Sequence, residues 1–149
     1  MKYMDMTCKP KNINELCHVE RAVSDKTYKA GTCFVKLSAV DEFVGQLQHP
    51  DIIDSRYAAL EPKDDTLNNK YLFLAINRKF SEFLRRYRTT INLQVDTLQH
   101  FIIDWHDDIQ TQRYIVQLIN MIDDEMTHTE RQIEIEKEIK QYYLKKMMC

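Results

Sequence analysis

Five basic residues near the middle of the chain are the first candidates for chemistry. They are Arg78, Lys79, Arg85, Arg86 and Arg88. Arg78 and Arg85 are seven residues apart, and so are Lys79 and Arg86. Residues seven positions apart lie on the same side of an α-helix. Rows of guanidinium and ammonium groups bind phosphates and acidic partners. The pattern predicts an anion-binding face for nucleic acid or acidic lipid, with an ordinary solvated helix face as the alternative.

A histidine–aspartate pair follows further along the chain. His106 and Asp107 resemble the paired His-Asp core of the HD phosphohydrolases, which are all-helical metal enzymes. The resemblance implies an HD-like metal phosphohydrolase with another histidine upstream and another aspartate downstream. The candidates for those ligands are His49 or His100 and Asp123 or Asp124. The Gly-Lys usual after the pair in that family is absent, so a solvated acidic helix end is the favoured interpretation.

Other sets of potential metal ligands are incomplete. Glu125 and His128 have the i, i+3 spacing of a di-metal site in a helical bundle, but such a site needs a second matching pair and more carboxylates. The four cysteines (8, 17, 33 and 149) contain no Cys-x-x-Cys pair that would indicate zinc. We therefore predict no catalytic residues, no metal and no cofactor, and a protein that is not an enzyme.

The overall composition is that of a globular protein. The chain has 149 residues, of which 44% are hydrophobic and 30% charged, with a net charge of −2. This length favours a single domain over residues 1–149. No apolar run approaches the ~18 residues of a membrane span, and the N-terminus lacks the apolar stretch of a signal peptide. We expect a soluble intracellular protein whose cysteines are thiols.

Long helices are predicted for the second half of the chain. Both glycines and all three prolines precede residue 63, and these residues are the strongest breakers of regular structure. Apolar residues at alternating steps of three and four then mark three helical stripes. The stripes are Phe73-Ile76-Phe80-Phe83-Tyr87, Ile91-Val95-Leu98-Ile102-Trp105, and Ile115-Ile122-Met126 with Leu118 or Ile119. We expect the helices to be interrupted near 89–92 and 107–111, and a helix to restart at Thr127.

The first 62 residues are predicted to form a shorter, irregular cap. Residues 32–37 are rich in β-formers and indicate a single strand or a hairpin with the residues before it. Short helices are expected at 13–23, 38–48 and 52–60. The predicted fold class is therefore mainly α: a bundle of three to four longer helices over about 63–148 with this N-terminal cap.

The final segment, about residues 130–148, predicts a contact with a partner. Ile133, Ile139, Tyr142 and Tyr143 do not fit on one narrow stripe, and the positions between them are mostly charged or polar. A helix of this kind leaves apolar side chains for self-association or for a protein partner. The leading functional hypothesis is a non-enzymatic interaction or structural subunit of a larger assembly. The second is an anion-binding adaptor that uses the basic helix, and the third is the HD-like hydrolase.

Overall fold

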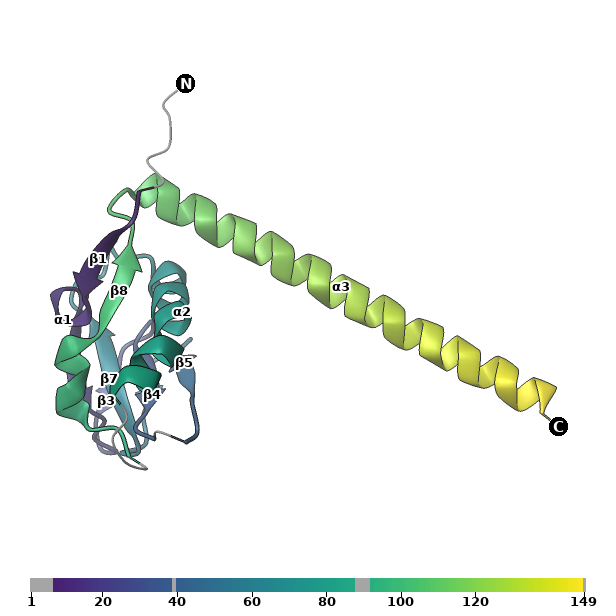
Figure 1. The fold of residues 1–149 in the computed structure, drawn as a ribbon, viewed down its shortest axis with the longest axis horizontal. Coiled ribbons are helices and arrows are strands. Elements are labelled where there is room, and N and C mark those ends of the chain that lie inside the picture. Colours follow the sequence, from purple (N-terminus) through teal and green to yellow (C-terminus); the bar gives the residue numbers. More distant parts are fainter. Residues whose placement is uncertain (1–6, 39, 88–91, 149) are drawn as a thin grey trace, which may run out of the picture. The chain divides into compact units, whose positions relative to one another are not determined.

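The computed structural model describes residues 7–38, 40–87 and 92–148 (Figure 1). About 50% of these residues are helical and 22% lie in strands. Tertiary contacts divide the chain into two units, residues 1–113 and 114–149. Because several antiparallel sheets lie in the first unit, the predicted mainly α bundle over about 63–148 with an irregular cap is wrong.

The described part of the first unit contains eight short strands in three antiparallel sheets. The largest sheet has the strand order β2-β7-β4-β5, and the two smaller sheets pair β1 with β8 and β3 with β6. The strands are β1 Lys9–Asn12, β2 Cys17–Arg21, β3 Thr27–Tyr28, β4 Cys33–Lys36, β5 Val44–Gln46, β6 Asp51–Ile52, β7 Tyr57–Pro62 and β8 Ile102–Trp105.

The N-terminal half contains strands in each segment where a short helix had been predicted. Of the segment 13–23, only α1 (Ile13–Leu16) is helical, and β2 follows it. The segments 38–48 and 52–60 contain β5 and most of β7. β7 pairs on both sides, and its run Ala58–Leu60 is buried, as is typical of a central strand. The strand predicted near 32–37 is present as β4, but its partners are β5 and β7.

The central helix predicted from the first stripe is present as α2, Asn69–Tyr87. Asn68 caps it, since the amide of Tyr71 donates to the Asn68 side chain at 3.1 Å. Ile76, Phe80 and Phe83 are buried, and the two ends of the stripe are half-buried. α2 contacts β8 of the β1-β8 sheet and β5 of the four-stranded sheet, so it packs against both sheets. The opposite face of α2 is exposed.

The second stripe does not form an α-helix in its described part. Its described part contains a 3₁₀ helix, η1 (Val95–His100), followed by β8. Phe101, Ile103 and Trp105 are buried and alternate with an exposed and a half-buried residue, which is the period of a strand. β8 pairs with β1 at the other end of the unit's sequence, and the Phe101 ring packs 6.0 Å from that of Phe80.

The third stripe lies in one continuous helix, α3, Ile109–Met147. Asp108 caps its start, because the amide and hydroxyl of Thr111 donate to the Asp108 carboxylate at 2.9 and 2.7 Å. The predicted restart at Thr127 is wrong, since no glycine or proline interrupts the helix there. None of the described helices combines the length and the apolar composition that crossing a membrane requires.

Candidate nucleic-acid interface

The exposed face of α2 is basic. α2 contains five basic residues and one acidic residue. Arg78 and Arg85 are both exposed, lie seven residues apart, and form no ion pair with any described residue. Their guanidinium groups are therefore available to an external anion. Arg88, the last member of the predicted basic group, lies outside the described residues.

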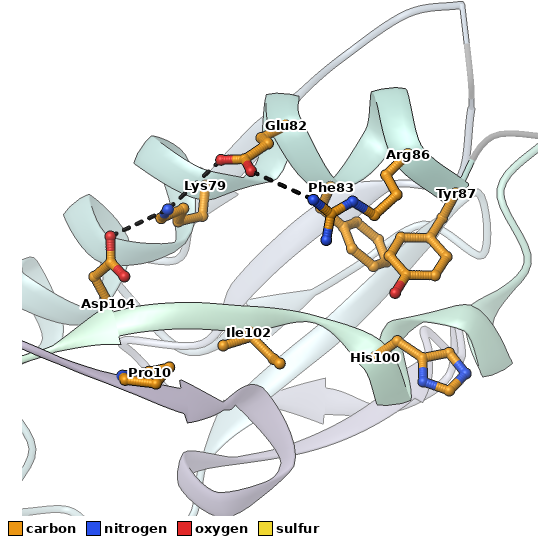
Figure 2. Close-up of a pocket in the computed structure, with 9 residues that line it drawn as sticks. All are labelled: Pro10, Lys79, Glu82, Phe83, Arg86, Tyr87, His100, Ile102 and Asp104. Atoms are coloured by element: carbon orange, nitrogen blue, oxygen red, sulfur yellow. Dashed lines mark ion pairs between the residues drawn. The ribbon is translucent and has the colours of Figure 1, made fainter.

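Two other members of the basic group are bound to acids of the protein. The Lys79 ammonium lies 3.2 Å from the Asp104 carboxylate and 3.5 Å from that of Glu82 (Figure 2). Arg86 lies 4.0 Å from Glu82 on the next turn. The hydrogen bond that the Lys79 ammonium donates to the Asp104 carboxylate raises the pKa of Lys79 above its ordinary value. The structure thus separates the predicted basic face into a free pair of arginines and a neutralised pair.

The neutralised pair borders a cavity of about 280 Å³ between α2 and β8. The cavity is lined by Pro10, Lys79, Glu82, Phe83, Arg86, Tyr87, His100, Ile102 and Asp104 (Figure 2). The Tyr87 and His100 rings are nearly parallel, with centroids 5.7 Å apart and an interplanar angle of 9°. Since each of its cations already has a carboxylate partner, the cavity is close to electrically balanced, and the net positive charge of α2 lies on its outer face.

The histidine–aspartate pair has structural partners. The Tyr71 hydroxyl lies 2.6 Å from Nδ1 of His106, and the Gln112 side chain donates to the His106 carbonyl at 2.6 Å. Asp107 is exposed and lies 3.2 Å from the Lys11 ammonium. Together these contacts join α2, β1 and the start of α3. The sheets of this unit also differ from the all-helical fold that the HD resemblance implies.

Within the described ranges, no group of three or more His, Cys, Asp or Glu side chains is arranged to hold a metal ion. Glu125 and His128 are exposed neighbours on α3. Cys17 and Cys33 are buried thiols, and burial raises the pKa of the Cys17 thiol to about 12. Such thiols are protonated at neutral pH and are poor nucleophiles or metal ligands.

The four residues predicted to bind a partner all lie on α3 in the second unit. Ile133, Ile139, Tyr142 and Tyr143 are 48%, 50%, 53% and 58% exposed. Other large apolar side chains of the same helix are also exposed, namely Leu118, Met121, Ile122, Met126, Ile135, Leu144 and Met147. One face of α3 thus carries a concave apolar surface around Leu118, Ile122 and Met126.

Asp104 is a residue of the candidate interface that the sequence interpretation missed. Its carboxylate binds the Lys79 ammonium and so neutralises one of the cations of α2. The available signal was the alternation of Phe101, Ile103 and Trp105, which marks a strand with Asp104 on the opposite side from the core. The pairing itself connects residues 25 positions apart in sequence and follows only from the packing of β8 against α2.

No protein-family model and no curated protein matches this chain. Solved structures do share its fold. One is the S subunit of a type I restriction-modification system from M. genitalium, with a TM-score of 0.66 and 13% identity over 93% of this chain and 45% of that chain. Another is a chain from a structure concerned with complex assembly and conformational transition of the type I restriction-modification system, with a TM-score of 0.72 and 17% identity over 93% and 44%.

A further structure with this fold is the HsdS subunit from Thermoanaerobacter tengcongensis, with a TM-score of 0.60 and 14% identity over 87% of this chain and 40% of that chain. At sequence identities this low, the structural similarity establishes a shared fold and nothing more. This chain spans less than half of the length of each of the three matching chains.

Proposed function

We propose that this chain is a non-catalytic subunit of a larger assembly that acts on DNA. In this proposal the first unit binds DNA through the outer face of α2, and α3 binds a protein partner. The observation that carries the DNA-binding part is the pair Arg78 and Arg85, which is exposed and forms no ion pair with the residues that the structure describes. The fold shared with subunits of type I restriction-modification systems supports DNA rather than acidic lipid as the ligand.

The dimensions of α2 suit a DNA duplex. Seven residues of α-helix span about 10 Å, which is close to the ~12 Å width of the major groove of B-DNA. Two arginines at this separation reach phosphates along the edge of one groove. Lys79 and Arg86 contribute less in this arrangement, because their acidic partners must first be displaced.

The salt dependence of DNA binding tests this proposal. The change is Arg78→Gln combined with Arg85→Gln, assayed in the full chain by fluorescence anisotropy of a labelled duplex across a salt series. Log K falls as log salt rises, and each lost phosphate contact makes this slope less steep by about 0.9. The slope of the double variant should therefore be less steep by about 1.8. The matched control removes the same charge from α3 by Arg131→Gln and Lys137→Gln, and should bind like the wild type.

Three results would count against the proposal. Wild-type binding that is independent of salt excludes the phosphate contacts. Equal affinity of the double variant and the wild type excludes α2 as the surface. Tighter binding to vesicles that contain an anionic phospholipid than to duplex DNA favours the acidic-lipid alternative.

A further inference from the structure

Another cavity of about 280 Å³ lies where β2 ends and β7 begins. It shares none of its described lining residues with the cavity between α2 and β8. Its lining combines two cations, one anion and three aliphatic side chains, namely Arg21, Arg56, Asp96, Leu37, Leu93 and Val95. Apolar surface with a few placed charges is typical of a site for a small molecule.

Arg21 is held in position with part of its guanidinium unoccupied. Its Nε donates to the Ser55 carbonyl at 2.9 Å, which fixes the side chain against the turn before β7. Arg21 is exposed and forms no ion pair with any residue that the structure describes. Its terminal nitrogens can therefore donate to an external acceptor, and their fork matches the two oxygens of a carboxylate.

Arg56 is already paired with an acid of the protein. Its Nε lies 3.0 Å from Oδ1 of Asp54, and this hydrogen bond raises the pKa of Arg56 and lowers that of Asp54. The pair offsets much of the positive charge of Arg56. Arg21 is therefore the main candidate ligand for an anionic group in this cavity.

Asp96 brings the opposite charge from another element, the first turn of η1. It is exposed, and its carboxylate is in no ion pair with a described residue. Asp96 and Arg21 line the same cavity without forming an ion pair with each other. A small molecule that carries both a negative and a positive group can thus contact both side chains at once.

The apolar part of the lining lies deeper than these charges. Leu93 is buried and Leu37 and Val95 are half-buried, whereas Arg21 and Asp96 are exposed. An aliphatic group that enters the cavity would therefore contact aliphatic side chains and lose its contact with water. The charged ends of the same molecule would remain near the mouth of the cavity.

We propose that this cavity binds a free α-amino acid with an aliphatic side chain. The carboxylate contacts Arg21, the ammonium contacts Asp96, and the side chain packs against Leu93. An anion without an ammonium, such as phosphate, would place negative charge beside Asp96 with nothing to offset it. The inference does not depend on the proposed DNA binding, because none of the described lining residues belongs to α2.

Titration of the ¹⁵N-labelled full chain with leucine, followed by NMR, tests this proposal. The amide signals of residues 93–96 should shift and saturate. Two analogues each lack one charged group: 3-methylbutylamine has no carboxylate, and 4-methylpentanoate has no ammonium. Each should bind at least about tenfold more weakly than leucine, because it loses a charge-assisted hydrogen bond.

Two variants assign the charged groups to their residues. Arg21→Gln should bind leucine at least about tenfold more weakly and should no longer prefer leucine to 3-methylbutylamine. Asp96→Asn should no longer prefer leucine to 4-methylpentanoate. The matched controls are Arg131→Gln and Asp123→Asn, which change exposed residues of α3 and should bind leucine like the wild type.

The Asp96 variant keeps the test decisive if Arg21→Gln is unstable, because Arg21 also holds the Ser55 carbonyl whereas Asp96 is exposed at the surface. Leucine that causes no saturable shift at residues 93–96 overturns the proposal, as does equal binding of leucine and both analogues. Inorganic phosphate that binds at these residues as tightly as leucine shows a simple anion site and also overturns it. The proposed DNA binding by α2 stands or falls separately, by its own salt series.

Discussion

At the scale of single residues, side chains of the same charge on α2 differ in their surroundings. Arg78 and Arg85 are exposed and have no acidic partner among the described residues, whereas Lys79 and Arg86 are paired with Asp104 and Glu82. A cation that already has a carboxylate partner gains less from a phosphate, because the first contact must be broken. In the proposed function, the acids beside the helix, rather than the number of basic residues on it, therefore determine which cations contact phosphate.

Asp104→Asn should strengthen DNA binding. The change releases Lys79 from its partner at 3.2 Å and adds one positive charge to the cavity side of α2. If the released ammonium makes one phosphate contact, the fall of log K with log salt becomes steeper by about 0.9. The measurement is the same anisotropy series, and Asp123→Asn on α3 is the control of equal charge. Unchanged affinity would mean that this side of α2 does not face the DNA.

The buried thiols should make the fold sensitive to alkaline pH. Burial raises the pKa of Cys17 to about 12 and also raises that of Cys33, whereas an exposed thiol titrates near 8.5. The unfolded state then releases protons above pH 8.5 that the folded state retains, so stability is complete below that pH and falls as pH rises toward 12. Each thiol accounts for up to about 2 kcal/mol between pH 8 and pH 10.

Denaturant unfolding at pH 8 and pH 10 measures this effect. The loss of unfolding free energy between the two pH values should be smaller in Cys17→Ala with Cys33→Ala than in the wild type. Cys8→Ala changes an exposed thiol and should leave the pH dependence as it is. Equal losses in all three proteins would show that the two thiols are solvated.

At the scale of elements, α2 serves both the core and the proposed interface. Its inner face buries Leu72, Ile76 and Phe80 completely, and its outer face carries the free arginines. Because α2 contacts strands of two different sheets, its position fixes both the cavity beside β8 and a cavity beside β5 that Gln46 and Asn69 line. A change that loosens the inner face should therefore disturb both cavities.

Phe80→Ala should destabilise the first unit by about 3–5 kcal/mol. Phe80 is fully buried, and its ring packs 6.2 Å from that of Phe83 and 6.0 Å from that of Phe101, so truncation leaves a cavity between α2 and β8. Chemical denaturation gives the free energy of unfolding. Ile52→Ala, at a site that is 58% exposed, is the control and should cost less than about 1 kcal/mol. An unchanged midpoint for Phe80→Ala would place this ring outside the core.

At the scale of the whole molecule, the chain consists of a sheet-containing unit and a helical unit. The second unit is the larger part of α3, whose apolar side chains are exposed over most of its length. A single helix cannot bury such side chains by itself, and a run of them indicates a partner surface. These exposed side chains support a partner for this helix as part of the proposed function.

Truncation after Glu130 should leave the first unit folded and weaken association with a second copy or with a protein partner. Ile139→Ser combined with Tyr143→Ser should have the same effect, because these side chains are exposed and are replaced by polar ones. Light scattering reports the association state, and a pull-down reports the partners. If the wild type and all variants are monomeric and capture the same proteins, α3 does not form a partner interface. Glu134→Gln with Lys137→Gln, which keeps the apolar residues, is the control.

The sequence by itself determined the elements whose pattern is local. The aromatic stripe at Ile76, Phe80 and Phe83 predicts α2, and the absence of glycine and proline after residue 62 favours long helices, of which α3 is one, although its continuity through Thr127 was not predicted. The basic residues of the candidate interface were also visible in sequence. These features are readable because helix formation depends on residues three and four positions apart.

Only the tertiary structure decided the sheets and the state of the charges. Ile102 and Trp105 fit a helical stripe, yet they lie in β8 because β1, over 90 residues earlier, supplies the hydrogen bonds of an antiparallel pair. Likewise, nothing near Lys79 in sequence shows that Asp104 binds it. Strand pairing and ion pairing join distant segments, and their free energy is realised only when folding brings those segments together.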